Sequence, residues 1–274
     1  AIMKDGTPRY PDGLPADWKW GWLKNFERLV KGKPGKGRPV YRYMTAWPSE
    51  TILAQSWDTE LLEEVGRAVG KEMLEIGVSV WLAPGLNIHR NPLCGRNFEY
   101  YSEDPIISGK MAAAVTHGVQ NCGGVGVSVK HFCCNNQEDN RVGVSANVSQ
   151  RALREVYLRA FRIAVTEGKP WTVMSSYNRV NGHYVCNSFD LCTRVLRQEW
   201  GFRGLVMSDW NATEQCSYSE AIHAGNDLIM PGTASVSKAL EKSLKAGELD
   251  RDALNLSAGR VLELIFKSET CQSF

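Results

Sequence analysis

Short apolar runs alternate with longer stretches of helical periodicity along this chain, from about residue 78 onward. Runs that are bounded by glycine, proline or serine and rich in branched apolar residues predict buried strands. They occupy residues 78–83, 125–129, 172–176, 205–208 and 227–230. The stretches between them predict helices over residues 106–120, 150–167, 190–199 and 251–266.

A further helix is predicted ahead of the first strand, because apolar residues recur there at helical spacing. They form one stripe, which comprises Leu61, Leu62, Val65, Ala68, Val69, Met73 and Ile76. A stripe of this width is typical of a helix that buries one face against a core.

The alternation of strands and helices predicts an α/β fold with a parallel sheet and helices outside it. The spacing between strands fits the units of a TIM-type (β/α)8 barrel with long loops. Five strands do not close such a barrel, so we expect it to be incomplete unless residues 1–57 or another segment supply the rest. Residues 1–47 are expected to be a loop-rich N-terminal segment of the barrel domain, and residues 48–274 the catalytic barrel.

The N-terminal segment holds five prolines, a basic run over residues 31–38 and three tryptophans, Trp18, Trp20 and Trp22. The basic run lacks interleaved aromatic residues and a P-loop signature, so a solvated loop is favoured over a phosphate or nucleic-acid contact. The tryptophans fit either a sugar site or packing on the barrel.

The composition mainly excludes certain classes of protein and site. The chain is 43% hydrophobic and 23% charged with a net charge of +2, typical of a globular protein without a polyanionic partner. It has no apolar run of about 18 residues, so we expect no membrane span. Its eight cysteines show no CxxC pair and no zinc-ligand spacing. They are interpreted as free thiols of a reducing, cytoplasmic compartment, although a single disulfide and export of the protein both stay open.

Polar side chains follow four of the predicted strands. Arg96 lies in the long polar loop after the first strand, Lys130 and His131 end the second, Tyr177 follows the third, and Asp209 and Trp210 follow the fourth. In α/β barrels the catalytic residues collect at this carboxyl edge. We therefore expect these side chains to lie together, with helix capping by Asp209 as the alternative.

This set of residue types points to a polyhydroxylated ligand. Carboxylate and cationic groups can bond to hydroxyls, Arg96 offers five fixed donors, and an indole face can stack on the apolar face of a sugar. A phosphate ligand would need more cations and no bare carboxylate. No two acids or histidines show ligand spacing, so we expect neither a metal nor another cofactor.

Several ordered motifs together resemble the N-terminal barrel domain of glycoside hydrolase family 3, from about residue 45 to 267. The motifs are NPLCGRNFE (residues 91–99), YSEDP (101–105), KHF (130–132), SYN (176–178) and VLRQEWGFRGLVMSDW (195–210). The resemblance implies a retaining β-glycosidase, commonly a β-glucosidase, that acts on small oligosaccharides or β-glucosides.

By motif match, Asp209 would be the nucleophile of this reaction, and Trp210 would contact the same sugar. Arg96, Lys130, His131 and Tyr177 would hold the sugar hydroxyls. Two carboxyl groups about 5 Å apart would act in turn in such a mechanism. A β-xylosidase of the same family, a carbohydrate-binding barrel without turnover, and an unrelated barrel enzyme that handles phosphorylated sugars stay as alternatives.

The sequence departs from the family pattern in two places. It has no Asp-Gly-Pro loop, and Asp5-Gly6-Thr7-Pro8 resembles that loop only loosely. In addition, no residue matches the glutamate that serves as general acid/base in most members of the family. A subgroup of the family uses a histidine dyad instead and has a glycine-rich pattern after Lys-His. Here Cys133-Cys134-Asn135-Asn136 follows the KHF motif, so this variant is disfavoured. N-acetylglucosamine is for the same reason a less favoured sugar. We therefore expect the barrel to pack against an α/β sandwich domain of the same polypeptide that carries the acid, and this chain alone to be a weak glycosidase.

Overall fold

The chain divides into two units, residues 1–47 and 48–274. The structure, a computed structural model, describes residues 44–272. The expectations for the basic run at residues 31–38 and for Trp18, Trp20 and Trp22 lie outside the described residues. All helices and strands of the described range belong to the second unit.

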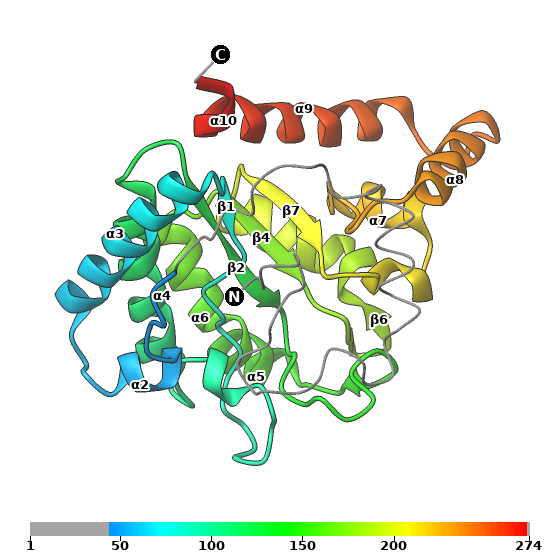
Figure 1. Cartoon of the computed structure of the whole chain (residues 1–274). Coiled ribbons are helices and arrows are strands. Elements are labelled where there is room, and N and C mark those ends of the chain that lie inside the picture. The colour runs from blue at the N-terminus through cyan, green and yellow to red at the C-terminus, as the bar shows by residue number, and fades with distance from the viewer. Residues whose placement is uncertain (1–43, 273–274) are drawn as a thin grey trace, which may run out of the picture. The chain divides into compact units, whose positions relative to one another are not determined.

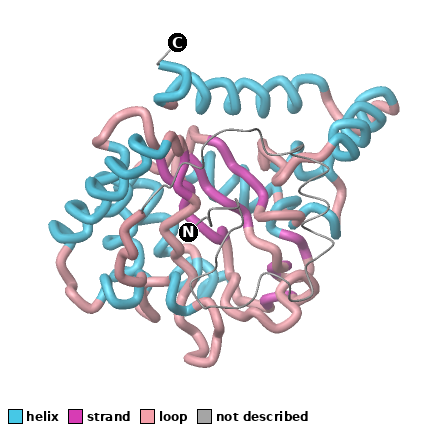
Figure 2. Tube along the Cα trace, in the orientation of Figure 1, coloured by secondary structure: helices cyan, strands magenta, loops and turns pink. Residues whose placement is uncertain are grey.

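A four-stranded parallel sheet forms the centre of the fold (Figure 2). Its strands lie in the order β1 (Val80–Trp81), β2 (Gly126–Phe132), β4 (Thr172–Ser175) and β7 (Leu205–Ser208). β4 and β7 pair without a shift over their whole length. Every residue of these two strands is buried, which reflects coverage of both faces and is usual in parallel sheets. The predicted α/β class with a parallel sheet is thus confirmed.

The prediction of a strand at residues 227–230 is wrong, because this segment forms only an isolated bridge. A single parallel bridge joins Leu228 to Met207. Asp227 and Leu228 both donate their backbone N–H to the carbonyl of Val206, at 2.8 and 3.0 Å. The N–H of Met230 then donates to the hydroxyl of Ser208 at 2.9 Å, so a side chain replaces the next step of the ladder. The segment occupies a strand's place beside β7 for one step only.

The predicted helices are present. They are α3 (Thr59–Ile76), α4 (Pro105–Gln120), the run α5 (Gln150–Ala152), η2 (Leu153–Tyr157), α6 (Arg159–Ile163) and η3 (Ala164–Gly168), η5 (Asp190–Glu199) and α9 (Arg251–Lys267). Further helices not predicted are α2 (Glu50–Ala54), η1 (Asn97–Glu99), η4 (Val185–Asn187), η6 (Ala212–Gln215), α7 (Tyr218–Ala224), α8 (Ala234–Lys245) and α10 (Glu269–Gln272). Figure 1 shows α3, α4 and α6 on one side of the sheet and α9 above it.

Helix α3 begins and ends at residues that suit a helix terminus. Asp58 accepts backbone hydrogen bonds from Glu60 and Leu61 at its start. Gly77 ends the helix with a φ of 70°, a conformation that costs a glycine little. The apolar stripe is buried at Leu62 and elsewhere along the helix, but Leu61, which was predicted to belong to it, is 40% exposed because it lies at the edge of the buried face.

A second, smaller sheet lies beside the first. It consists of β3 (Ser145–Ala146), β5 (Arg179–Val180) and β6 (His183–Tyr184), with β3 parallel to β5 and β5 antiparallel to β6. β5 begins two residues after Tyr177, and β3 follows the long loop that leaves β2. This sheet therefore ties the loop after β2 to the chain after β4.

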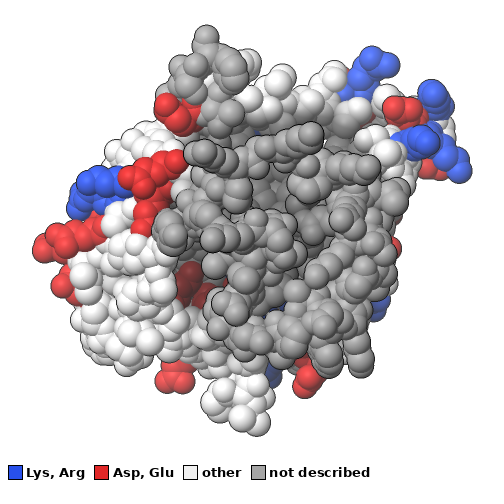
Figure 3. Space-filling model, in the orientation of Figure 1, with Lys and Arg blue, Asp and Glu red and all other residues white. Residues whose placement is uncertain are grey.

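Charges of both signs stand together on the surface. Figure 3 shows acidic and basic side chains side by side over α3 and α8. α3 carries glutamates together with Arg67 and Lys71, and α8 carries Glu241 among its lysines. Within residues 44–272, no helix combines the length and the apolar character that crossing a bilayer requires.

Asp227 is a buried ionic hub that joins three elements. Its carboxylate accepts from Arg197 of η5 and Arg260 of α9, each at 2.6 Å, and from the N–H of Val206 in β7 at 2.9 Å. Ser257 of α9 donates to it at 3.2 Å. All of these donors converge on a side chain with no exposed surface. The hub holds α9 against the edge of the sheet.

We predict that Asp227→Ala destabilises the fold by about 3–5 kcal/mol, because it leaves two largely buried guanidinium groups, whose side chains are 9% and 17% exposed, without a counter-ion. Urea unfolding followed by circular dichroism measures this difference. Asp250→Ala, which removes an exposed aspartate ahead of α9, is the matched control and should change stability by less than about 1 kcal/mol. Equal effects of the two substitutions would contradict the structural role assigned to Asp227.

Candidate active site

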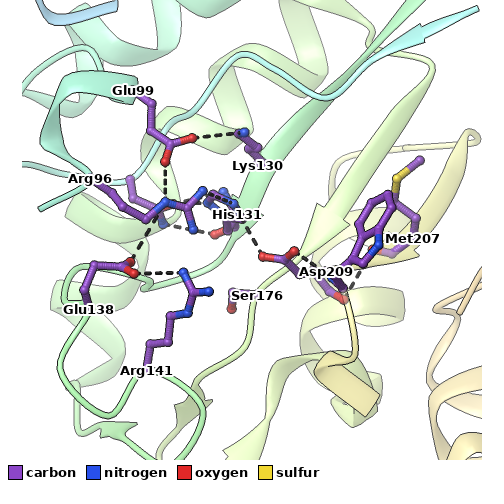
Figure 4. Close-up of polar contacts among 12 residues, drawn as sticks. Arg96, Glu99, Lys130, His131, Glu138, Arg141, Ser176, Met207 and Asp209 are labelled. Atoms are coloured by element: carbon purple, nitrogen blue, oxygen red, sulfur yellow. Dashed lines mark hydrogen bonds and ion pairs between the residues drawn. The ribbon is translucent and has the colours of Figure 1, made fainter. Parts of the chain in front are cut away.

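The carboxyl ends of the strands bring the predicted site residues together. The N–H of Ser176 donates to the carbonyl of Phe132 at 2.7 Å, and the N–H of Asp209 donates to that of Ser175 at 3.1 Å. The ends of β2, β4 and β7 are therefore aligned. Figure 4 shows His131, Ser176 and Asp209 arriving side by side from these three strands.

Lys130 and His131 are adjacent in the chain, and both belong to the site. Side chains of neighbouring strand residues normally point to opposite faces. The pairing of β2 with β4 shifts register between Val129 and Phe132, so the strand is irregular where these two residues lie. An irregularity of this kind re-aims side chains. It accounts for the placement of both residues in one network (Figure 4).

Asp209 has one satisfied and one unsatisfied carboxylate oxygen. Oδ1 accepts from the N–H of Trp210 at 2.7 Å. Oδ2 is buried, and no donor of the described residues forms a hydrogen bond to it. The residue is only 8% exposed. Burying a carboxylate oxygen without a partner is unfavourable, which marks Asp209 as functional rather than structural.

The charge of Asp209 is set by opposing effects. Burial raises the pKa of this carboxyl above its ordinary value. The N–H of Trp210, the guanidinium of Arg96, the hydroxyl of Tyr177 and the guanidinium of Arg141 act in the opposite direction. The cations thus limit a shift that burial alone would make larger.

His131 is held as a neutral imidazole. Burial, followed by the positive charges of Arg96, Lys130 and Arg141, places its pKa well below the ordinary value. Its Nε2 lies 3.0 Å from Nη2 of Arg96, and because arginine only donates, Nε2 accepts. The proton is then on Nδ1, which lies 3.2 Å from the Tyr100 hydroxyl.

This tautomer has a consequence for Asp209. Nε2 of His131 lies 3.5 Å from Oδ2 of Asp209 and carries no proton to donate. Asn87 fixes the backbone of His131 from both sides, since it accepts from the N–H at 2.9 Å and donates to the carbonyl at 3.0 Å. Oδ2 of Asp209 therefore faces a fixed ring that donates no hydrogen bond to it.

Two glutamates separate three cations around the site. Glu99 accepts from Nε of Arg96 and from Nζ of Lys130, the latter at 3.0 Å. Glu138 lies 2.8 Å from Nη1 of Arg141 and 4.0 Å from Nε of Arg96. Burial opposes ionisation of Glu99, but its bonds to Arg96 and Lys130 outweigh this effect and hold its pKa below the ordinary value. Figure 4 shows this chain of ion pairs.

Tyr177 and Trp210 complete the predicted set. The guanidinium of Arg141 lies 4.7 Å from the centre of the Tyr177 ring. Burial and the charge of Asp209 raise the pKa of Tyr177 to about 12, so its hydroxyl keeps its proton at neutral pH. The indole of Trp210 is 41% exposed and therefore available for contact with a ligand.

The chain after β1 is fixed to the rest of the site through Gly85. Both carboxylate oxygens of Glu50 accept from the N–H of Gly85, at 3.1 and 2.9 Å. A Cβ on Gly85 would collide with the carbonyl of Glu99 and the ring of Tyr100. Glycine is needed here because the segment that carries Glu99 passes directly beside it.

Of the six residues predicted from the sequence, the structure joins Arg96, Lys130, His131, Tyr177 and Asp209 in one network, with Trp210 next in the chain. Their roles stay predictions. Of the three acids in the long loop after β1, only Glu99 enters the network, because Asp104 caps α4 and Glu103 is exposed.

Sequence reasoning missed the bridging roles of Glu99 and Glu138 and the contact between Arg141 and Tyr177. The spacing of Glu138 and Arg141, three residues apart in a polar loop, was the available signal, since residues at this spacing can pair in a turn. No group of three or more histidine, cysteine or carboxylate side chains among residues 44–272 could hold a metal ion. All eight cysteines lie in this range, and each is a free thiol.

Comparisons with known proteins agree on one family. Residues 33–264 match the N-terminal domain of glycosyl hydrolase family 3. The chain is 45% identical over 223 residues to thermostable beta-glucosidase B of Acetivibrio thermocellus, which covers 81% of this chain and 29% of that protein. It is 43% identical over 229 residues to an exo-alpha-(1->6)-L-arabinopyranosidase of Bifidobacterium breve, which covers 84% of this chain and 30% of that protein.

A solved structure of beta-glucosidase 3B from Thermotoga neapolitana in complex with glucose superimposes with a TM-score of 0.83 at 49% identity. The match covers 88% of this chain and 34% of that one. The chain thus spans about a third or less of the length of these relatives. From the motifs, the sheet and the sequence match together, we conclude that this chain belongs to glycosyl hydrolase family 3 and represents its N-terminal, TIM-like barrel domain.

Proposed function

We propose that this chain is the nucleophile-bearing barrel of a retaining β-glycosidase that removes terminal β-D-glucosyl residues. The observation that carries the proposal is the buried Oδ2 of Asp209, which no hydrogen-bond donor among the described residues satisfies. A carboxylate oxygen with a free lone pair, facing cations and a neutral imidazole, is the arrangement that a carboxylate nucleophile needs.

In the first step Oδ2 of Asp209 forms a bond to the anomeric carbon while the bond to the glycosidic oxygen breaks. That oxygen leaves with a proton from a general acid. In the second step water attacks the anomeric carbon and loses a proton to the same group, and the bond to Asp209 breaks. The configuration is inverted twice and therefore retained.

The surrounding side chains are suited to hold a pyranose against Asp209. Arg96 and Lys130 present donors to sugar hydroxyls and share Glu99, which is available as an acceptor. His131 fixes the guanidinium of Arg96 through Nε2. We propose that Tyr177 donates a hydrogen bond near the anomeric centre and that Trp210 stacks on the apolar face of the ring.

The general acid is proposed to come from outside residues 44–272. Glu99 and Glu138 are the carboxylates of the network around Asp209, and both are paired with arginines. A low pKa makes Glu99 a poor proton donor at neutral pH. We propose that an α/β sandwich domain of the same polypeptide supplies the acid.

A second sugar has specific support. The relatives include beta-glucosidases, but also an exo-alpha-(1->6)-L-arabinopyranosidase at 43% identity. An α-L-arabinopyranoside lacks the hydroxymethyl group of a β-D-glucoside and has the opposite configuration at C4, and a β-D-xyloside lacks the hydroxymethyl group alone. Comparing the three dinitrophenyl glycosides decides which sugar the site prefers.

We predict that Asp209→Asn lowers the release of dinitrophenol from 2,4-dinitrophenyl β-D-glucoside by about 10³-fold or more, because it removes the nucleophile. This leaving group departs without protonation, so a missing acid does not limit the first step. Stopped-flow absorbance measures the burst. Release at the wild-type rate by Asp209→Asn would contradict the proposal, and sugar binding without any release would favour a binding barrel.

Asp209→Asn should not weaken the fold. Because the pKa of Asp209 is raised in the native state, the native state loses stability relative to the unfolded chain as pH rises through the unfolded and then the folded pKa. At neutral pH the charged form is therefore unfavourable. We predict that the thermal midpoint of Asp209→Asn at pH 7 equals or exceeds that of the wild type, which separates lost chemistry from lost structure.

We also predict the acid limb of the first step. Asp209 must be ionised to attack, and burial raises its pKa, so the burst rate should fall at a pH above the value of about 3.9 for a free aspartate. The pH dependence of the dinitrophenol burst measures this limb. A limb at or below that value would show that the cations outweigh burial and would contradict the predicted upward shift.

A further inference from the structure

Two cysteine thiols are in contact where the segment that leaves β7 meets the segment that leaves β6. Cys186 belongs to η4, and Cys216 directly follows η6. Their sulfur atoms lie 3.2 Å apart, although the two residues are 30 positions apart in the chain. A disulfide has a sulfur–sulfur distance of about 2.05 Å, so an approach of about 1 Å would join them.

Contacts on both segments set the positions of these thiols. Both sulfur atoms lie near the carbonyl oxygen of Ala212, that of Cys186 at 3.9 Å and that of Cys216 at 4.0 Å. Asn187, next to Cys186, donates from Nδ2 to the carboxylate of Glu220 in α7 at 2.9 Å. Figure 1 shows β6 and α7 on the same side of the sheet, beyond β7. The native fold therefore holds the two thiols toward each other.

The two thiols differ in their access to solvent. Cys186 is completely buried, whereas Cys216 is partly exposed. The residues that precede Cys216, Glu214 and Gln215, are exposed. A soluble reagent can therefore reach Cys216 but not Cys186. An accessible thiol with a second thiol beside it is the arrangement found at redox-sensitive cysteines.

The contact also distributes negative charge unequally between the two sulfur atoms. A hydrogen bond from the Cys186 thiol lowers the pKa of Cys216, while burial and the charge of Glu220 act in the opposite direction. The same hydrogen bond, together with burial, raises the pKa of Cys186. Cys216 is thus the thiol that ionises first. Because the thiolate is the reactive form, the accessible member of the pair is also the nucleophilic one.

Contact with a second thiol and access to solvent are not combined at Cys122, Cys133, Cys134 or Cys192. Cys133 and Cys134 are neighbours in the chain, but both are buried. Cys192 is also buried, and its thiol donates to the carbonyl of Val185 at 3.1 Å. Cys122 is partly exposed, but its thiol donates to two backbone carbonyls, at 3.4 and 3.6 Å.

We propose that Cys216 and Cys186 form a redox-active pair, which a low-molecular-weight disulfide such as oxidised glutathione converts to a disulfide bond. The Cys216 thiolate attacks one sulfur of the reagent, the sulfur–sulfur bond of the reagent breaks, and one glutathione leaves and takes up a proton. The mixed disulfide removes the negative charge that held the proton on Cys186.

In the second step Cys186 loses this proton to solvent, and its sulfur attacks that of Cys216. The bond between Cys216 and glutathione breaks, and the second glutathione leaves and takes up a proton. Two protein thiols are thereby oxidised, and one molecule of the reagent is reduced to two thiols.

The disulfide would tie the segment that begins at Asp209 to the segment that follows β6. Because such a bond restricts the unfolded chain, we expect the thermal midpoint of the oxidised protein to exceed that of the reduced protein by about 3 °C or more. An equal or lower midpoint would show that the native positions of the thiols do not suit the bond, and would contradict the proposal.

The experiment treats the folded chain with oxidised glutathione, alkylates the remaining thiols and maps tryptic peptides by mass spectrometry. In the wild type we expect peptide 180–194, which contains Cys186, to be linked to peptide 204–238, which contains Cys216, with no glutathione retained. In Cys186→Ser we expect one glutathionyl group that stays on Cys216, because no thiol releases it. Cys122→Ser changes another partly exposed thiol and, as the matched control, should behave as the wild type.

Peptide 180–194 also contains Cys192, so the linkage must persist in Cys192→Ser and disappear in Cys186→Ser. An unmodified Cys216, glutathione retained on Cys216 of the wild type, or a linkage through Cys192 would overturn the proposal. Should Cys186→Ser not fold, the linked peptides of the wild type and of Cys192→Ser decide the question. These measurements require no turnover, so their outcome is independent of the proposed function.

Discussion

The site depends on a buried carboxylate that stays ionised although the described residues do not offer a hydrogen-bond donor to each of its oxygens. Asp209 is nearly covered, and one of its oxygens has no donor among the described residues. Burial favours the neutral acid, while a nucleophile must be ionised. Arg96 and Arg141 supply positive charge that does not bond to Oδ2, and Glu99 and Glu138 keep the three cations of the site from repelling one another. The charge is stabilised at a distance, and the oxygen stays free.

Two buried aspartates in the same chain show the contrast between structural and functional carboxylates. Both oxygens of Asp227 accept hydrogen bonds, from two arginines, a serine and a backbone N–H. Asp209 has one backbone donor and a neutral imidazole at 3.5 Å. Asp227 joins helices to the sheet, whereas burial raises the pKa of Asp209 and so disfavours its charged form. Such a cost is common where a side chain is kept for chemistry rather than for folding.

Much of the fold could be predicted from the sequence, because the apolar runs of β2, β4 and β7 and the stripe of α3 follow directly from burial. The placement of Asp209, Lys130 and His131 at one edge followed from their positions at the ends of parallel strands. The sequence could not exclude a strand at residues 227–230. Its pairing with β7 ends where the N–H of Met230 donates to the Ser208 hydroxyl instead of a backbone carbonyl, and the pattern of apolar residues does not reveal such a contact. The contact between Arg141 and Tyr177 arises from the pairing of β3 with β5, two short strands without a clear periodicity.

The most direct test of the account is to label the nucleophile. The chain is incubated with 2-deoxy-2-fluoro-β-D-glucosyl fluoride, whose fluoride departs without an acid and whose ring fluorine slows the second step. Peptide mass spectrometry then locates the added sugar. The account predicts one fluoroglucosyl group on the peptide that contains Asp209, bonded to its carboxylate, and none in Asp209→Asn. Labelling of a different carboxylate, with Asp209 unmodified, would contradict it.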